Sequence, residues 1–567
     1  MSRPVAYFSM EIAIDSSIPT YSGGLGVLAG DTIRGAADLG VPMVAVTLLH
    51  RKGYVRQSIS EHGEQLEAPE QWEPEQLLSR CQPIVDVPIK DRIIRVQAWK
   101  RVEVGVTGHS VPIIFLDTDV VENTPEDRRI TDSLYGGDHG LRLLQELVLG
   151  VGGGRMVRAL GYPAETIYHM NEGHAAFLLL DRIPDEGCDD TEGKLQELRH
   201  RTVFTTHTPV PAGHDVFTVD HVSFVLAPEH LKKASQVFRD GYLNMTRLAL
   251  EFSGTVNAVS RKHMDVTKEM FPEAEVYGIT NGVHAVRWTA PPFARLFDKF
   301  LPGWRQRSEQ LRQAILIPVE DVQQAHRECR ESFLRAVESR VGMPFGGAGI
   351  VIGFARRATE YKRPLLIFND LPRLQRLAEQ FGPINLVFAG KAHPRDEWGK
   401  LLIKAVHELG AKGGDLVRVA FLPNYETHLA AQMVAGVDVW LNTPRAPMEA
   451  SGTSGMKCAL NGVPSLSIAD GWWLEGGVQG VTGWVIKSPL NEGGVAPMEQ
   501  DHADAEALYT QLEQHVLPMF FHNHMAFGEV MRNAIALNGS FFNTHRMVDQ
   551  YRVMAYERFA ASGGQCE

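Results

Sequence analysis

Short runs of apolar, largely β-branched residues recur along the chain, and each ends in a polar or glycine-rich turn. The runs cover 41–49, 112–117, 166–171, 201–206, 350–355, 385–390 and 416–422. Strands with such continuous apolar character are typical of parallel sheets that are covered on both faces. Helical patterns separate the runs, so we predict an α/β fold with doubly wound sheets.

The strand-like runs fall into two groups. The segment ITNGVHAVRWTAPP at 279–292 lies between them, and its Asn-Gly and Pro-Pro pairs indicate a crossover. A chain of 567 residues is also too long for one core. We therefore expect an N-terminal domain over 1–284 and a C-terminal domain over 285–540.

The last stretch of the chain has helical periodicity. Met547, Tyr551 and Phe559 recur at helical spacing, with Met554 or Ala555 between the last two. This pattern predicts that 541–567 forms a helix that packs back on the body of the protein.

Composition narrows the class of protein. Hydrophobic residues make up 44% and charged residues 22%, and no apolar run is long enough for a membrane span. The start, MSRPVAYFSM, has no signal-peptide pattern, and the five cysteines form no CxxC pair. A net charge of -12 disfavours nucleic acid as a partner. We expect a reduced, cytoplasmic protein that binds neither membrane nor nucleic acid.

The segment YSGGLGVLAGD at 21–31 is a glycine turn that leads into a predicted helix. Backbone amides in such a turn can hold a phosphate or a sugar hydroxyl. The glycine spacing does not match the dinucleotide fingerprint, which argues against an NAD site. A tight turn that only packs against the sheet remains the alternative.

The segment FARRATEYKRP at 354–364 follows a predicted strand and contains Arg356, Arg357, Lys362 and Arg363. Arginine offers a bidentate fork and lysine a point charge, so together they suit inorganic phosphate. A solvated basic loop is the other interpretation.

A third segment, MEASGTSGMKCALNG at 448–462, places Lys457 after a run of Gly, Ser and Thr. It is not a Walker A motif, because Met456 and Cys458 flank the lysine, so a nucleotide hydrolase is disfavoured. Lys457 could bind phosphate, form a Schiff base, or lie on the surface near the start of a helix.

Histidines and acids cluster in HMNEGH at 169–174 and HTPVPAGHD at 207–215. Their spacing fits no standard zinc pattern, so hydrogen bonding to a polyhydroxylated substrate is favoured over a metal. Glu172 and Glu449 could in principle be the carboxylate pair of a glycoside hydrolase. Both sit among small residues suited to hydroxyl binding.

These segments, in this order, resemble those of the α-glucan phosphorylases, the family of glycogen, starch and maltodextrin phosphorylases. EASGTSGMKCALNG resembles the family's signature at the pyridoxal-phosphate lysine, and FARRATEYKRP its phosphate-site segment. YSGGLG, NEGH, TTHTPVPAG and TNGVHAVRW fall at matching places. The resemblance implies a GT-B architecture, in which two Rossmann-like domains face each other across a cleft. It places glucan binding in the first domain and pyridoxal 5'-phosphate in the second.

The resemblance also implies roles for residues at matching positions. The expected catalytic residues are Lys457, Arg357, Lys362 and His207. Lys457 would form an imine with the cofactor, whose ring and phosphate would lie near Thr453, Ser454, Gly455, Tyr425, Arg356 and Gly24. Substrate contacts would come from Glu449, Ser451, Gly452, Asn281, Leu25, Glu172, His174, Asp138 and His139, with His207 also near the glucosyl unit.

The implied reaction is retaining phosphorolysis of terminal α-1,4-linked glucose, which yields α-D-glucose 1-phosphate. A glucan has no amine to exchange into an imine, so the cofactor's phosphate would instead act as a proton relay. The expected partners are an α-glucan and inorganic phosphate, with a homodimer as a further option.

The sequence also departs from the better-known members of the family. The first strand begins near Val5, from which we expect no long N-terminal regulatory segment. LYGGDHGLR at 134–142 resembles a shortened gate loop, and Arg356 and Ala13 replace a more usual lysine and aromatic residue. A sugar-nucleotide glycosyltransferase of the glycogen-synthase type and a non-catalytic glucan-binding regulator are the alternatives. Lys457 argues against the first, and its retention with Arg357 and Lys362 argues against the second.

Overall fold

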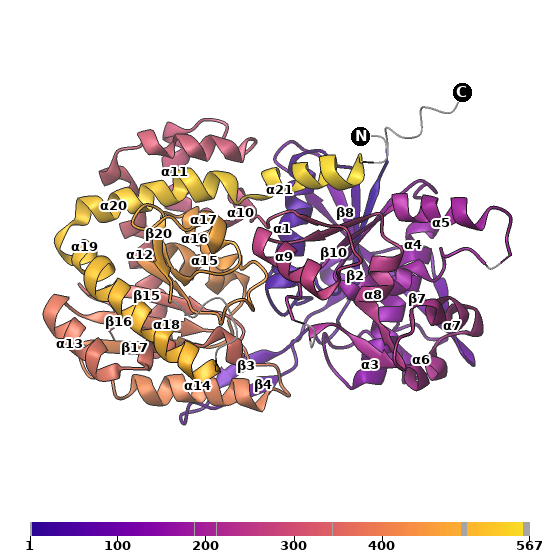
Figure 1. Cartoon of the computed structure of the whole chain (residues 1–567), viewed down its shortest axis with the longest axis horizontal. Helices are drawn as coiled ribbons and strands as arrows, with labels where there is room; N and C mark the ends of the chain where they lie inside the picture. The colour runs from indigo at the N-terminus through magenta and orange to yellow at the C-terminus, as the bar shows by residue number, and fades with distance from the viewer. Residues whose placement is uncertain (1–2, 186, 211–212, 343, 489–495, 559–567) are drawn as a thin grey trace. The chain divides into compact units, whose positions relative to one another are not determined.

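The computed structural model describes residues 3–185, 187–210, 213–342, 344–488 and 496–558 (Figure 1). Contacts between residues divide the chain into two compact units. The described residues of Met1–Tyr54, Pro69–Thr280 and Met547–Glu567 form the first unit, and those of Val55–Ala68 and Asn281–Arg546 form the second. The chain therefore enters the second unit twice.

A ten-stranded sheet organises the first unit. Seven strands run parallel in the order β14-β13-β10-β9-β1-β2-β8, and β7, β5 and β6 add an antiparallel edge. Their bounds are β1 (Val5–Phe8), β2 (Met43–Leu48), β5 (Ser79–Arg80), β6 (Val85–Ile89), β7 (Arg92–Val104), β8 (Ser110–Asp117), β9 (Ile167–Asn171), β10 (Thr202–Thr205), β13 (Thr255–Ala258) and β14 (Val276–Gly278).

Both faces of this sheet are buried. Alternate residues of β1 point to opposite sides: Ala6 and Phe8 belong to one apolar cluster, and Val5 and Tyr7 to the other. Side chains of α3 (His139–Leu147), α4 (Gly153–Ala159) and α8 (Met245–Glu251) complete the first cluster. Those of α1 (Gly24–Asp38) and α21 (Thr544–Tyr551) complete the second. Burial on both faces explains why these strands read as continuous apolar runs.

The second unit contains a six-stranded, fully parallel sheet in the order β17-β16-β15-β18-β19-β20. The strands are β15 (Ile350–Ala355), β16 (Ile384–Ala389), β17 (Val417–Leu422), β18 (Val439–Asn442), β19 (Ser465–Ile468) and β20 (Gly483–Ile486). Numbered along the chain, this order is 3-2-1-4-5-6, the strand order of a Rossmann fold. The prediction of an α/β fold with doubly wound parallel sheets is confirmed.

The strand order indicates where each unit can hold a ligand. In doubly wound sheets, ligands bind beyond the carboxyl ends of the two central strands from which the chain turns in opposite directions. Those strands are β15 and β18 in the second unit, and β1 and β9 in the first. The segments that follow them are therefore the first places to look for a site.

The remaining helices connect the strands. In the first unit they are α2 (Pro74–Leu77), α5 (Thr191–His200), α6 (Val219–Val225), α7 (Pro228–Ala234) and α9 (Arg261–Met270), beside a small hairpin of β11 (Val216–Thr218) and β12 (Tyr242–Asn244). In the second they are α10 (Ala285–Trp288), α11 (Pro291–Phe300), α12 (Val319–Val341), α13 (Leu371–Phe381), α14 (Glu397–Gly410), α15 (Thr427–Gly436), α16 (Ser454–Ala459), α17 (Trp473–Gly476), α18 (Pro497–Gln511), α19 (Leu517–His522) and α20 (His524–Asn533).

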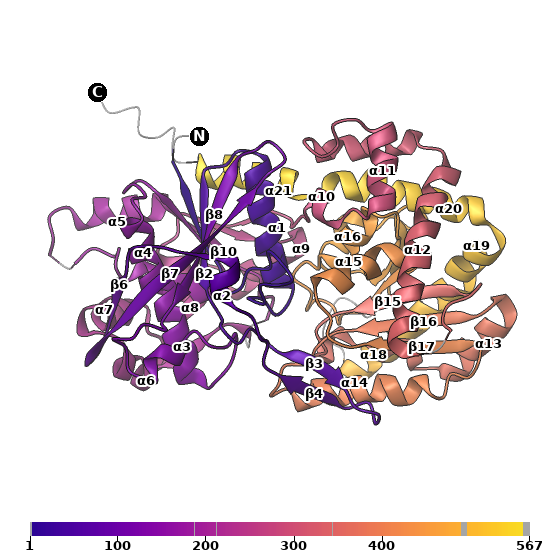
Figure 2. The same cartoon turned by 180° about the vertical axis from the view of Figure 1, so that it is seen from behind.

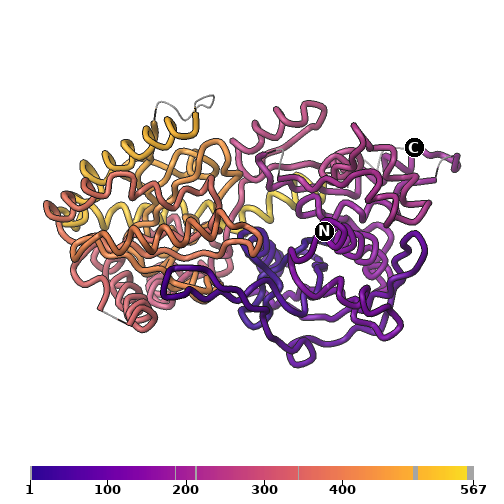
Figure 3. The backbone as a smooth tube through the Cα atoms, turned by 90° about the horizontal axis from the view of Figure 1, so that it is seen from below, coloured from indigo at the N-terminus to yellow at the C-terminus, as the bar shows by residue number. Residues whose placement is uncertain are grey.

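A hairpin from early in the chain belongs to the second unit. Its strands, β3 (Arg56–Ile59) and β4 (Gln65–Ala68), pair in antiparallel register and lie beside α14 (Figure 2). In Figure 3 the hairpin is the indigo loop that runs among orange segments. It contributes no strand to either large sheet.

Helix α21, near the C-terminus, packs against the core of the first unit (Figure 1). Its continuation, Arg552–Tyr556, is π-helical, and the hydroxyl of Tyr556 lies 2.8 Å from Nδ1 of the buried His169. The ring of Tyr551 also contacts His169. Phe559, which the helical spacing included, lies outside the described residues.

Over the described part of the chain, none of the helices combines the length and apolar character that crossing a membrane requires.

Candidate active site

The turn after β15 is where basic side chains collect in the second unit. Lys362 is buried, and the side chain of Arg356 is only 7% exposed. Arg363 is also buried, where it pairs with Asp501 and Asp504 on α18. A solvated basic loop, the alternative interpretation of this segment, is therefore excluded for these three residues. Arg357, in contrast, is exposed.

Glu449 joins two of these cations. Its carboxylate, in the loop after β18, accepts a hydrogen bond from Lys362 Nζ at 2.7 Å and another from Arg356 Nη2. The loops that follow the two central strands of the sheet thus meet in one buried cluster of charges. Nη1 of Arg356 is buried without a hydrogen-bond partner, so the cluster retains one unused donor.

The pKa values of two neighbouring carboxyl groups in this cluster are shifted in opposite directions. Burial would raise the pKa of Glu449, but Arg356 and Lys362 lower it to about 2. Asp470 accepts the backbone N–H of Glu449 at 2.9 Å and that of Gly471 at 2.8 Å. Burial raises the pKa of Asp470 to about 7. Glu449 is therefore ionised at neutral pH, whereas Asp470 titrates there.

The loop that follows Glu449 leads into the short helix α16 and carries Lys457. This lysine is 8% exposed, so it is not a surface residue. Its Nζ lies 3.3 Å from Thr453 Oγ1 and 4.5 Å from the centre of the Trp288 ring. The Lys457 amine is therefore shielded from solvent and lies against an aromatic face.

Small residues are required around this lysine. Gly452 has φ +76°, a backbone conformation that favours glycine. A Cβ at Gly455 would lie 2.7 Å from both Ser465 Oγ and the ring of Trp472. Ser454 Oγ accepts a hydrogen bond from Trp440 Nε1 at 3.0 Å. The loop before Lys457 is therefore held by Ser465 and Trp472, which pack against Gly455, and by Trp440, which binds Ser454.

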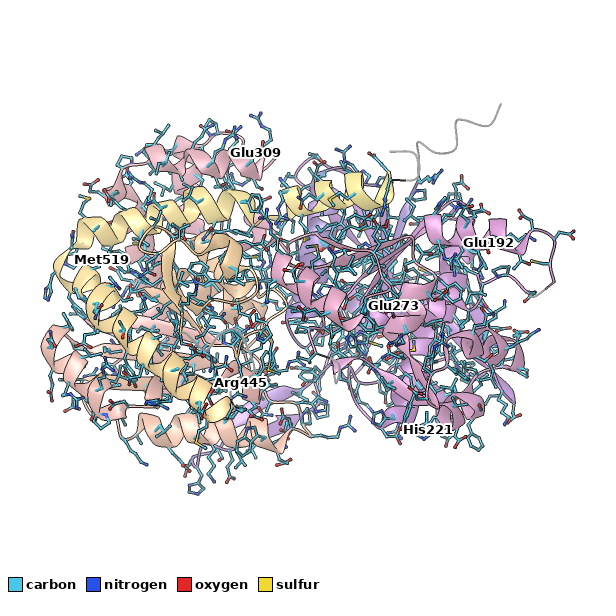
Figure 4. The ribbon with its side chains drawn as sticks, viewed as in Figure 1. Glu192, His221, Glu273, Glu309, Arg445 and Met519 are labelled. Atoms are coloured by element: carbon cyan, nitrogen blue, oxygen red, sulfur yellow. The ribbon has the colours of Figure 1, made fainter. Side chains whose placement is uncertain are left out.

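Tyr425 and Asn281 are further predicted residues that belong to the second unit. Tyr425 follows β17 and is half-buried. Asn281 is buried, and its Oδ1 has no hydrogen-bond partner. Arg445, which was not predicted and is labelled in Figure 4, lies in the loop after β18 and pairs with Asp501 at 3.0 Å.

In the first unit, the predicted glycine turn leads into α1, as expected. The carboxylate of the buried Glu11 accepts the backbone N–H groups of Ser22 at 2.6 Å and Gly23 at 3.1 Å. It also accepts the Tyr135 hydroxyl at 2.9 Å. Two amides of the turn thus already bind an anion, Glu11, while a Cβ at Gly24 would have no atom within 4 Å. The neighbouring Leu25 is half-buried.

Glu172 and His207 lie together after β9 and β10. The carboxylate of Glu172 accepts the His207 N–H at 2.7 Å and the Thr208 hydroxyl at 3.0 Å. Burial lowers the pKa of His207 to about 4, and its Nε2 lies 2.7 Å from Asn171 Oδ1. His207 is therefore a neutral hydrogen-bonding group at pH 7.

His174 is held by a separate network. Its Nε2 lies 3.1 Å from Asp215, which Arg142 also contacts at 3.0 Å. Asp138 and His139 are exposed at the start of α3, where Asp138 accepts the Leu141 N–H at 3.0 Å. The structure thus gives Asp138 the role of a helix cap, and His139 is the first residue of the helix.

Glu172 and Glu449, the predicted carboxylates, do not form the acid–base pair that hydrolysis requires. Burial would raise the pKa of Glu172, but the surrounding imidazoles and the His207 N–H lower it below its usual value. Glu449 is also ionised at neutral pH. A glycoside hydrolase needs one protonated carboxyl as a general acid, and neither residue supplies it. The cluster of Arg356, Lys362 and Glu449 is instead suited to an anionic ligand.

Several residues in and around these sites were not predicted. Trp288 lies in the TNGVHAVRW segment, but nothing in a single tryptophan marks it as the partner of a lysine. In the sequence, Asp470 belongs to an Asp-Gly pair that is typical of an ordinary turn, and Glu11 is an acidic residue between two apolar ones. Only their long-range contacts reveal their roles.

Two Rossmann-like units, with a basic cluster beyond the central strands of the second, define a GT-B enzyme of the glycosyltransferase type. Residues 218–518 match the family model described as Phosphorylase, carbohydrate phosphorylase. The chain belongs to the carbohydrate phosphorylase family.

Individual relatives agree with this assignment. The chain is 40% identical to "Maltodextrin phosphorylase" of Thermococcus litoralis, over 99% of this chain and 71% of that protein. It is 37% identical to "Glycogen phosphorylase" of Mycobacterium tuberculosis, over 96% and 70% of the two chains. For "Glycogen phosphorylase" of Aquifex aeolicus the identity is 32%, over 99% and 87%.

Proposed function

We propose that this protein is an α-1,4-glucan phosphorylase. It would transfer the terminal glucosyl unit of glycogen or a maltodextrin to inorganic phosphate, with retention, and release α-D-glucose 1-phosphate. Family membership and the names of the relatives support this function. The observation that carries it is the buried cluster of Arg356, Lys362 and Glu449, because binding a neutral glucan alone requires no such cations.

Arg356, Arg357 and Lys362 would bind phosphate. Nη1 of Arg356 is a buried donor without a partner, which a phosphate oxygen can satisfy. Lys362 Nζ now donates to Glu449, so an arriving phosphate dianion would compete with that carboxylate for the lysine. Displaced from Lys362, Glu449 would turn its ionised oxygens to the hydroxyls of the glucosyl unit.

The residues around Lys457 fit pyridoxal 5'-phosphate. A buried amine lies beside an aromatic face, a glycine-rich loop precedes it, and Arg356 has an unpaired buried donor. Lys457 would hold the cofactor covalently, with Tyr425 near its ring. Its phosphate would be bound by Thr453, Ser454, Gly455, Arg356 and Gly24. When bound, the cofactor supplies a phosphate whose second pKa of about 6 allows proton exchange at neutral pH.

The glucosyl unit would be bound mainly by polar groups that the sequence predicted. Asn281 offers a buried Oδ1 without a partner, and His207 offers a neutral imidazole. The further contacts would come from Glu449, Ser451, Gly452, Leu25, Glu172, His174, Asp138 and His139. These groups orient the sugar through hydrogen bonds, and none of them has to act as a general acid.

This assignment divides the work between the predicted domains. Residues 1–284 would bind the glucan, 285–540 would hold the cofactor, and 541–567 would pack back on the body. The cytoplasmic location and the homodimer stay predictions from the sequence.

The function can be tested by measuring glucose 1-phosphate after incubation with maltodextrin, phosphate and pyridoxal 5'-phosphate. We expect the wild type to form it and Lys457→Ala to form none. Lys412→Ala, which removes an exposed lysine of the same unit, should match the wild type. An inactive wild type, or a fully active Lys457→Ala protein that binds no cofactor, would overturn the proposal.

A further inference from the structure

The hairpin β3–β4 is joined at both ends to the chain of the first unit, yet it packs within the second (Figure 2). The roles proposed for the glucan and phosphate sites assign nothing to it. The hairpin nevertheless contacts the loops after β16 and β17. The first of these loops binds the turn that carries Arg356, and the second carries Tyr425.

Two buried glutamines make the most specific of these contacts. Gln57 is 3% exposed, and its Nε2 donates to the Gly390 carbonyl at 2.9 Å while its Oε1 accepts the Asn424 N–H at 2.9 Å. Gln65, 6% exposed, binds both backbone groups of Ala392, at 3.0 Å and 2.9 Å. Gln57 Nε2 also donates to Gln65 Oε1 at 2.7 Å.

An amide is the side chain that these positions require. Each glutamine donates and accepts at the same time, which neither a carboxylate nor an apolar side chain of similar size can do. Together they satisfy four backbone groups in the loops after β16 and β17. Without them, these buried groups would lose their partners.

The loop after β16 in turn fixes the turn that carries Arg356. Gly390 has φ +144°, and a Cβ there would lie 1.9 Å from the Arg356 carbonyl oxygen. The Arg356 N–H donates to Ala389 at 3.2 Å, and the Ala358 N–H donates to Lys391 at 3.1 Å. The position of Arg356 therefore depends directly on the segment that the two glutamines hold.

The second loop leads to Tyr425. Asn424, the preceding residue, has φ +53° and accepts the Gln57 N–H at 3.1 Å through its side chain. Gln57 thus binds both the backbone and the side chain of Asn424. One residue of the hairpin thus binds both the loop after β16 and the loop after β17.

A small apolar cavity lies beside the Arg356 turn, lined by Phe354, Arg356, Phe388, Gly390 and Ile403 among others. Next to it, Ile59 of β3 packs against the cluster of Ala358, Ala392 and Ile403. The hairpin thus packs against Ala358 and Ile403, which also line the cavity.

We propose that Gln57 and Gln65 are positioning residues for phosphate binding, because they fix the turn that carries Arg356 and the loop that carries Tyr425. This inference rests on the proposed function of those loops. It extends that function to a segment that is remote in the chain, since Gln57 bonds Gly390 at a separation of 333 residues.

The test compares Gln57→Met with a control on the same hairpin, Glu64→Gln. Glu64 pairs with Lys404 at 2.9 Å on the exposed side of the hairpin, away from both loops. We expect Gln57→Met to raise KM for phosphate about tenfold while KM for maltodextrin changes less than about twofold. Thermal stabilisation of the protein by inorganic phosphate, measured without glucan, should weaken in parallel. Glu64→Gln should behave as the wild type.

A purely structural role gives a different result, because loss of folded protein lowers the apparent kcat and leaves both KM values unchanged. A lower kcat with both KM values unchanged, in an active Gln57→Met protein, overturns the inference.

If Gln57→Met does not fold, Asn424→Gly replaces it. Glycine tolerates the left-handed conformation, and the substitution removes only the bond from the Gln57 N–H. Its KM for phosphate should rise about threefold, and an unchanged value contradicts the inference. A wild type that forms no glucose 1-phosphate refutes the proposed function instead.

Discussion

Replacing Glu449 by glutamine tests the electrostatics of the site. Its carboxylate is 8% exposed and binds Lys362 at 2.7 Å as well as Arg356. The pKa of Glu449 falls from 4.5 to about 2, and a shift of that size corresponds to about 3 kcal/mol of folding free energy. Removing one partner of a buried ion pair typically costs about 3–5 kcal/mol, which agrees.

Glu449→Gln should therefore lower the melting temperature at pH 7 by about 6 °C, taking about 2 °C per kcal/mol for a unit of this size. Because the carboxylate is favoured in the folded state, its contribution is complete above about pH 4.5 and is lost as the pH falls towards about 2. The difference between wild type and variant should thus shrink at about pH 3.5. Calorimetry at both pH values measures it.

Phosphate provides an independent readout. In the variant two buried cations have lost their carboxylate, so phosphate should raise the melting temperature of Glu449→Gln more than that of the wild type. Glu360→Gln is the control, because Glu360 is 67% exposed and 3.5 Å from Arg445. It should change stability by less than about 0.5 kcal/mol. Equal melting temperatures for wild type and Glu449→Gln at pH 7, with equal responses to phosphate, would refute the reasoning.

Three further predictions concern other parts of the chain. Burial raises the pKa of Asp470 from 3.8 to about 7, so the free energy of unfolding should fall as the pH rises from about 4 to about 7, and less steeply in Asp470→Asn, as thermal melts across that range will show. Gly390→Ala, with a Cβ 1.9 Å from a carbonyl oxygen, should cost at least about 2 kcal/mol in urea denaturation and raise KM for phosphate. Gly414→Ala, at φ +74° with open space, should cost only about 1 kcal/mol and leave KM unchanged. Tyr556→Phe removes the 2.8 Å contact with His169 and should lower the free energy of unfolding by about 1–2 kcal/mol, and an unchanged urea midpoint would contradict this.

The sheets were predictable because of where their strands lie. Strands such as β15 and β16 are buried along their whole length, which produces uninterrupted apolar runs in the sequence. The glycine-rich and basic loops at their ends were visible for the same reason, as they interrupt those runs. The burial of Lys457 could not be predicted, since the residues around it are small and polar.

Contacts between distant residues were not predictable. The sequence assigned Glu449 to the sugar and Lys362 to phosphate, whereas the structure joins them across 87 residues. Gln57 and Gln65 are polar residues in a segment without a clear pattern, and bonds from amide side chains to a backbone leave no periodic signal. Residues 56–104 contain the hairpin and the antiparallel edge of the first sheet, and none of the apolar runs that predicted strands falls there.

Because the chain passes through the second unit twice, the protein cannot be completed one unit at a time during synthesis. The hairpin leaves the ribosome before any other part of the unit in which it packs, and Met547–Tyr556 leave it after nearly all of the unit that they help to bury. Domains usually fold as contiguous stretches, from the N-terminus onward. Here the apolar cluster that includes residues of β1 and α1 stays incomplete until the second unit has been translated, because Met547, Val548 and Tyr551 belong to it.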